Sequence, residues 1–192
     1  MSAGTRIVGY FEGVRAALAA ATAEGQPLFR DVRVHLDPFD LDAIFAETFQ
    51  TPAARVIFGQ GKPDANADGG FDLVVTGIVA VIAKRSGRPD PAIASADAGA
   101  LSLALDVASL IAVDPYFGLG RVTAAQVGGI KVALSEKSTK EGMAVVLVEF
   151  ESRLLRLVAP WPQADALFTP TAPPRTAMVT VDGAPFLPEP GP

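Results

Sequence analysis

The feature that most constrains the fold is an uncharged apolar run from Leu73 to Ala83, inside the segment FDLVVTGIVAVIAKRSG at residues 71–87. Most of its residues are Val, Ile or Thr, and β-branched side chains favour a strand. Side chains of a strand point alternately to its two faces. Both sets are apolar here: Leu73, Val75, Val79 and Val81 at odd positions, and Val74, Ile78, Ala80 and Ile82 at even positions. We therefore expect both faces of this strand to be covered.

A helix that could cover one face follows in the sequence. The segment SADAGALSLALDVASLIAVD, residues 95–114, has Ser95 and Asp97 near its start and Pro115 beyond its end, as a capped helix does. Its predicted inner stripe consists of Leu101, Leu105, Ala108 and either Ile111 or Leu110. The second face would need another sheet layer, the N-terminal helix or a neighbouring subunit.

The remaining segments alternate between helical and strand patterns. An amphipathic helix is predicted from Ile7 through Tyr10, Phe11, Val14, Leu18 and Ala21, stopping at Gly25. A strand at 30–37, a helix capped by Asp40 with an inner stripe of Leu41, Ile44, Phe45 and Phe49, and a short strand at 54–59 come next. The Gly-, Pro- and Asp-rich residues 60–70 predict an exposed loop. Two strands at 120–137 and 142–158, joined by the turn STKE, predict a hairpin, with a bulge at Gly128 and Gly129.

Composition suggests one domain with an appendage. Residues 1–158 form the expected α+β domain, and nine of the sixteen prolines fall between Pro160 and Pro192, which predicts an extended arm over residues 159–192. The chain is 49% hydrophobic and only 19% charged, so apolar surface is expected to remain for partners. No segment has the roughly 20 uninterrupted apolar residues of a membrane span, and we expect a cytoplasmic protein.

Charge and cysteine content exclude several functions. The absence of cysteine excludes disulfides, thiolate metal sites and a cysteine nucleophile. The net charge of −5 argues against a protein that grips nucleic acid through phosphate contacts, which require an excess of Lys and Arg.

Four groups of residues have the composition of a chemical site, and each also has a structural explanation. Asp64, Asn66, Asp68 and Gly69 fit the first half of a calcium loop, but the twelfth position, where glutamate belongs, is Val75. His35 is the only histidine, and Asp37, Asp40 and Asp42 follow it closely in the sequence, as ligands of a metal can. Acidic residues are also common at the start of a helix, which explains these three aspartates without a metal. Glu149 and Glu151 point to the same strand face as Arg153. Paired carboxylates can perform acid–base chemistry, but charged residues at alternate positions are also typical of an exposed sheet face. The G-x-G stretches at 59–61 and 118–120 lack a phosphate-loop context. We predict no catalytic, cofactor or metal site.

The order of these elements resembles that of the tail-terminator, or tail-completion, proteins of Mu-like phages and prophages. The resemblance covers about residues 1–158 and is carried by the segments IVGYFEGVRAALAA, FDLVVTGIVAVIAKRSG, GALSLALDVASLIA and GMAVVLVEFESRLL. It implies an α+β fold with a mainly antiparallel four- to five-stranded sheet flanked by helices.

The resemblance also implies a structural virion protein without enzymatic activity. Its copies, typically six, would form a ring that caps the tail tube, stops tube polymerisation and offers the surface where the head docks. The implied partners are further copies of the chain, the tail tube protein and the head–tail connector or stopper protein, with assembly in the host cytoplasm and no membrane. At −5 per copy, a ring of six carries −30, so DNA would pass its channel without specific binding.

Three alternatives remain open from the residues alone. A head-side connector or stopper of the neck stays within virion assembly. A small enzyme would use Glu149 and Glu151 or the acids near Asp37, and a calcium-binding module would use the loop at Asp64.

Overall fold

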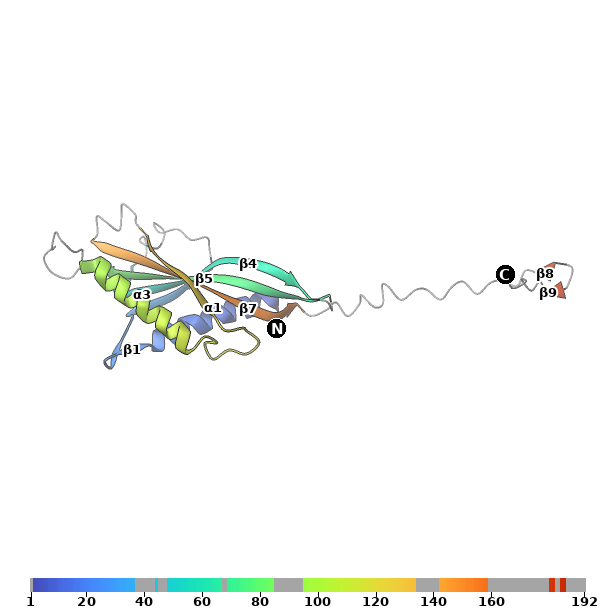
Figure 1. Ribbon diagram of the computed structural model, residues 1–192, viewed down its shortest axis with the longest axis horizontal. Coiled ribbons are helices and arrows are strands. Elements are labelled where there is room, and N and C mark those ends of the chain that lie inside the picture. Colours follow the sequence, from blue (N-terminus) through green and yellow to red (C-terminus); the bar gives the residue numbers. More distant parts are fainter. Residues whose placement is uncertain are drawn as a thin grey trace. The chain divides into compact units, whose positions relative to one another are not determined.

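The protein is an α+β structure built on one five-stranded mixed sheet, as expected for its class (Figure 1). The computed structural model describes residues 2–36, 44, 48–66, 69–84, 95–133, 142–158, 180–181 and 184–185. The chain divides into two compact units, Met1–Ala159 and Pro160–Pro192. In the second unit, the two-residue strands β8 (Thr180–Val181) and β9 (Ala184–Pro185) pair antiparallel.

The large sheet has the strand order β3-β4-β5-β7-β6. β3 pairs parallel with β4, and the other three pairings are antiparallel, so the sheet is mixed. The two longest strands, β5 and β7, lie next to each other inside the sheet. The bounds are β3 Asp31–His35, β4 Ala53–Ala65, β5 Phe71–Lys84, β6 Gln126–Ala133 and β7 Met143–Val158.

Both described helices of the first unit lie on the same face of this sheet (Figure 1). Helix α1 (Ala3–Ala20) begins at Ser2, whose Oγ accepts a hydrogen bond from the Thr5 amide at 3.2 Å, and helix α3 is Ser95–Val113. Arg6 of α1 donates to the carbonyls of Leu155 and Arg156 at the end of β7. The helices and the sheet enclose one large core.

The predicted inner stripe of α1 is confirmed, because Tyr10, Phe11, Val14 and Leu18 are all buried. The predicted end of this helix is wrong. The helix stops at Ala20, and β1 (Thr22–Ala23) and β2 (Gln26–Pro27) form a short hairpin turning through Glu24 and Gly25. Both turn residues have positive φ, 50° and 78°, which matches the tight turn that suits strand twist.

The apolar run at 73–83 is a strand, and its odd-numbered face is buried. Val75, Val79 and Val81 have no exposed surface, and they pack beneath α1 and α3. Burying each valine contributes about 1.5–3 kcal/mol. This face supplies much of the core.

The even-numbered face of β5 is only partly dry, so the expectation that both faces are covered is half wrong. Ala80 and Ile82 are buried beside Ile44 and Val145 in a second, smaller core cluster. Val74, Thr76 and Ile78 are half-buried. Their partners on β7 are Arg153, Glu151 and Glu149, which give this half of the face a charged surface. The long stems of such side chains shield apolar neighbours without a second layer.

A buried arginine stabilises the part of the even-numbered face that is covered. Arg55 on β4 is fully buried, and its Nη2 lies 3.1 Å from Oδ2 of Asp31 on β3. Its guanidinium lies 5.2 Å from the centroid of the Phe49 ring. Arg33 contacts the same Asp31 carboxylate at 3.0 Å and donates to the carbonyl of Thr48. The two arginines thus connect β3 and β4 to the segment at 48–49 that closes this end.

Strand β4 is much longer than predicted. Residues 60–65, expected in a loop, continue the strand and pair with residues 71–76 of β5, past a bulge between Phe58 and Gln60. Glycine and proline are tolerated here because this end of β4 is exposed. The predicted bulge at Gly128 and Gly129 is confirmed by a register shift between Val127 and Gly129 in the β6–β7 pairing. The predicted helix beginning at Asp40, apart from Ile44 and the residues from 48 on, lies outside the described residues.

Gly77 and Phe150 form the closest fit in the core. The two residues are directly paired across β5 and β7, and a Cβ at position 77 would lie less than 3.0 Å from the Phe150 ring. Phe150 is fully buried and makes an edge contact with Phe117, at 6.1 Å between ring centroids. Tyr10 contacts Phe117 in the same way, and burial raises the pKa of Tyr10 to about 12.

Gly77→Ala is expected to lower the free energy of unfolding by about 1–3 kcal/mol, because the added methyl group overpacks the Phe150 ring. Chemical denaturation measures the change. Gly129→Ala is the matched control, since this strand glycine has no heavy atom within 4 Å of the added carbon. Its stability should stay unchanged or rise by up to about 1 kcal/mol. Equal behaviour of the two variants would contradict this packing.

Replacing either arginine of the Asp31 pair by glutamine compares a buried and an exposed ion pair on one carboxylate. Arg55→Gln should cost about 3–5 kcal/mol, because it leaves a buried network incomplete. The Arg33 side chain is 46% exposed, so Arg33→Gln should cost no more than about 1 kcal/mol. Denaturation curves of the two variants measure the difference, and similar losses would show that burial does not govern this pair.

Candidate self-association surface

Helix α3 packs on the sheet through its smaller side chains. Ala100, Ala104, Val107 and Ile111 are buried against the core, whereas Leu101 is 40% and Leu105 is 57% exposed. The predicted inner stripe is therefore wrong for Leu101 and Leu105 and correct for Ile111. Alanine at positions 100 and 104 lets the helix axis approach the sheet closely, and this contact turns the leucines outward.

The sequence carried a signal for this orientation. Residues 100, 104, 107 and 111 are spaced i, i+4, i+7 and i+11, which makes an apolar stripe as regular as the leucine-bearing one. Most residues of this helix are apolar, so two apolar stripes compete for the sheet. Packing against the sheet decides which of them is buried.

Strand β6 is an edge strand whose apolar side chains are partly exposed. Within the described part of the chain, it pairs only with β7. Val127, Ile130 and Val132 lie opposite Phe150, Val148 and Val146, which places them on the helix-bearing face of the sheet. Val127 is 38% and Val132 is 52% exposed. An edge strand with unpaired backbone groups and apolar side chains is a natural place for another chain to pair.

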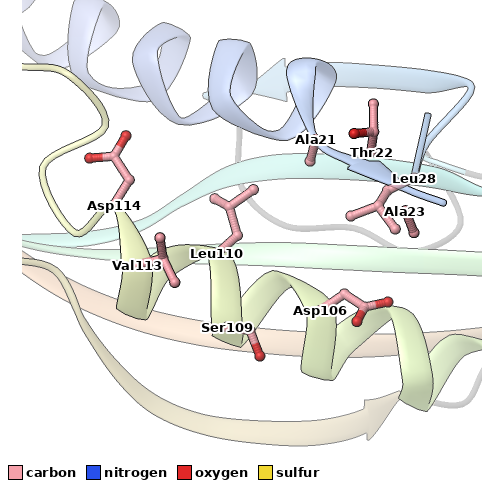
Figure 2. Close-up of a pocket in the computed structure, with 9 residues that line it drawn as sticks. All are labelled: Ala21, Thr22, Ala23, Leu28, Asp106, Ser109, Leu110, Val113 and Asp114. Atoms are coloured by element: carbon pink, nitrogen blue, oxygen red, sulfur yellow. The ribbon is translucent and has the colours of Figure 1, made fainter. Parts of the chain in front are cut away.

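The exposed flank of α3 lies on the side of this edge strand. Leu110, on the other flank, points towards the end of α1 (Figure 2). Helical spacing puts Leu101 and Leu105 on the flank away from Leu110. We call the resulting set the apolar edge surface: Leu101, Leu105 and Ala108 of α3 with Val127, Ile130 and Val132 of β6. Surfaces that combine exposed leucine and valine with a free strand edge typically bind other proteins.

The paired carboxylates weighed for acid–base chemistry are surface residues of the sheet. Glu149 Oε1 lies 2.8 Å from Lys131 Nζ of β6, and Lys131 also donates to its Oε2 at 2.9 Å. Glu151 is exposed, and Arg153 pairs with Asp64 at 2.9 Å. The two glutamates thus stand on an open, charged face of the sheet. Exposed ion pairs of this kind support solubility more than chemistry.

The residues of the calcium pattern are held by other contacts. Asp64 belongs to β4, and Asn66 Nδ2 donates to Asp72 Oδ1 at 3.1 Å. Gly69 takes a positive φ of 82° in the turn, and Val75 is buried in the core. Asp68 lies outside the described residues. The residues that the structure describes include no group of three or more acids or histidines able to hold a metal.

His35, at the end of β3, is half-buried and pairs in register with Ile57. Asp37, Asp40 and Asp42 lie outside the described residues. Gly59 and Gly61 lie within β4, and Gly118 is a turn residue with a φ of 66°. These positions therefore form no phosphate-binding loop.

Asp72 is a residue that sequence reasoning missed. It is buried near the start of β5, where β7 bulges, and its Oδ1 accepts hydrogen bonds from the Arg156 amide at 2.6 Å and from Asn66. The Arg156 amide bond, followed by the Asn66 bond, lowers the pKa of Asp72 below its ordinary value of 3.8, and Arg153 lowers it further. This carboxylate holds the β4–β5 turn to the last residues of β7.

Asp72→Asn should lower the melting temperature at pH 7, because the charged acceptor of the Arg156 amide is lost. A carboxylate with a depressed pKa stabilises the fold above its unfolded-state value, and this contribution disappears as the pH falls through the folded-state pKa. The difference between wild type and variant should therefore shrink below about pH 3.8. Thermal melts across the acid range measure it, with the half-exposed Asp64→Asn as control. A pH-independent difference would contradict this role.

None of the helices in the described ranges is long and apolar enough to cross a membrane. No protein-family model matches the chain, and no significant match was found among curated proteins.

Proposed function

We propose that this chain is the tail terminator of a phage or phage-derived tail, a structural protein without enzymatic activity. Six copies would close into a ring that caps the tail tube, stops its polymerisation and presents a surface to the head. The observation that supports self-association is the apolar edge surface, where Leu105 and Val132 are each more than half exposed.

Physical arguments favour assembly through this surface. Leucine exposed on a helix beside a free strand edge gains about 1.5–3 kcal/mol when a neighbour buries it. The charged half of the opposite sheet face, with Glu149, Glu151 and Arg153, is suited to solvent. The apolar edge surface would then be buried between subunits of the ring, while the charged sheet face would remain in contact with solvent.

The net charge is compatible with a passage for DNA. A ring of acidic subunits repels phosphates, so the genome could move through the channel without being held. The α+β class agrees with the class that the resemblance implies, although the five-stranded sheet is mixed.

Leu105→Glu should dissociate the ring, because it places a charge in the buried contact. Native mass measurement should give about six times 19.9 kDa for wild type and mostly monomer for the variant, with the dissociation constant raised at least tenfold. Val8→Glu is the matched control, since Val8 of α1 is a 43% exposed apolar residue outside the apolar edge surface and outside the groove between α1 and α3. Circular dichroism should show both variants folded.

Two results would count against the proposal. A wild-type protein that stays monomeric and does not bind tube ends would exclude a ring terminator. A ring insensitive to Leu105→Glu would show that another surface forms the contact. Particles lacking the protein distinguish a terminator, whose loss gives overlong tubes, from a head-side connector, whose loss gives tubes of normal length without heads.

A further inference from the structure

A groove of about 350 Å³ lies between the end of α1 and the C-terminal half of α3 (Figure 2). Ala21, Ala23 and Leu28 line one side, and Leu110 and Val113 point into it from α3. The volume is large enough for one apolar side chain and the stems of its neighbours. This groove is on the flank of α3 away from the apolar edge surface.

Two acidic residues mark the ends of the groove. Asp106 of α3 and Asp114, the first residue after this helix, are eight positions apart, which corresponds to about 12 Å at a helical rise of about 1.5 Å per residue. Figure 2 shows them on either side of Leu110 and Val113. Neither carboxylate forms an ion pair with any residue in the described ranges.

The helix termini add to the negative potential. Both α1 and α3 end at the groove, and neither has a basic residue in its last turn. A helix C-terminus carries a partial negative charge of about half a unit, which Lys or Arg usually offsets. Here two such termini and two carboxylates surround an apolar floor without a described counter-charge.

We propose that this groove binds an extended segment of a partner protein with Lys or Arg at positions i and i+4 and an apolar residue at i+2. In an extended chain these three side chains point to one face and span about 13 Å, close to the separation of the two aspartates. The apolar residue would enter the groove beside Leu110 and Val113, and each cation would reach one carboxylate. The stems of Lys and Arg would pack along the apolar walls.

Other ligands fit this chemistry poorly. Aspartates eight residues apart, at about 12 Å of helical rise, are poorly placed to share one metal ion, whose bonds to oxygen are about 2.0–2.6 Å long. Nucleic acid phosphates would be repelled by the aspartates and by both helix ends. A basic peptide segment meets both the apolar floor and the charge.

The test uses a fluorescently labelled heptapeptide of sequence ARALARA, with binding followed by anisotropy. Wild-type protein should bind it, more weakly as salt rises, and should bind AEALAEA at least tenfold more weakly. Replacing the central leucine by serine should also weaken binding, since the groove then receives no apolar side chain. Asp106→Asn with Asp114→Asn should reduce affinity at least tenfold.

A matched double variant controls for net charge. Glu12→Gln with Glu151→Gln removes the same number of negative charges from exposed positions outside the groove and should leave affinity within about twofold. Equal losses in the two double variants, or equal binding of the acidic peptide, would overturn the proposal. The assay can be repeated on the Leu105→Glu variant, so failure of this inference is distinguishable from failure of ring assembly.

Discussion

The structure depends on the contact between Gly77 and Phe150 at the centre of the sheet. Because position 77 has no side chain, the outer end of the Phe150 ring can lie against β5, and the ring also contacts Phe117, which Tyr10 contacts from α1. This aromatic chain joins the two inner strands to the N-terminal helix and to the loop after α3. The orientation of α3, and with it the exposure of its leucines, follows from the close approach that Ala100 and Ala104 permit.

The two faces of the sheet serve different purposes. The helix-bearing face holds the large core, and among the described residues the opposite face is buried at the end that Arg55, Asp31 and Phe49 close. Charged side chains cover the rest of that face. Apolar surface left over from folding is therefore found along α3 and β6 and not, as the alternation of β5 suggested, over the middle of the sheet.

Sequence reasoning succeeded where local pattern decides structure. The inner stripe of α1, the strand character of 73–83, the β6–β7 pairing and the bulge near Gly129 all follow from periodicity or from glycine placement. It failed where tertiary contact decides. β4 extends through a segment of loop-like composition because β5 offers it a pairing partner, and α3 rotates because Ala100 and Ala104 permit close approach. The groove at Asp106 and Asp114 could not be predicted from the sequence, because one of its walls comes from residues 21–28, which are distant along the chain.

The sheet has two unlike ends, and this asymmetry limits how copies can be arranged. β3 runs parallel to its neighbour, whereas β6 runs antiparallel to its own. Two copies that joined β6 to β6 would be related by a two-fold axis. Both β6 edges would then be occupied, so this contact could build a dimer but no larger assembly. If β6 met any other surface of the next copy, the contact would repeat with one polarity, and the rotation per step alone would decide between a closed circle and an endless filament.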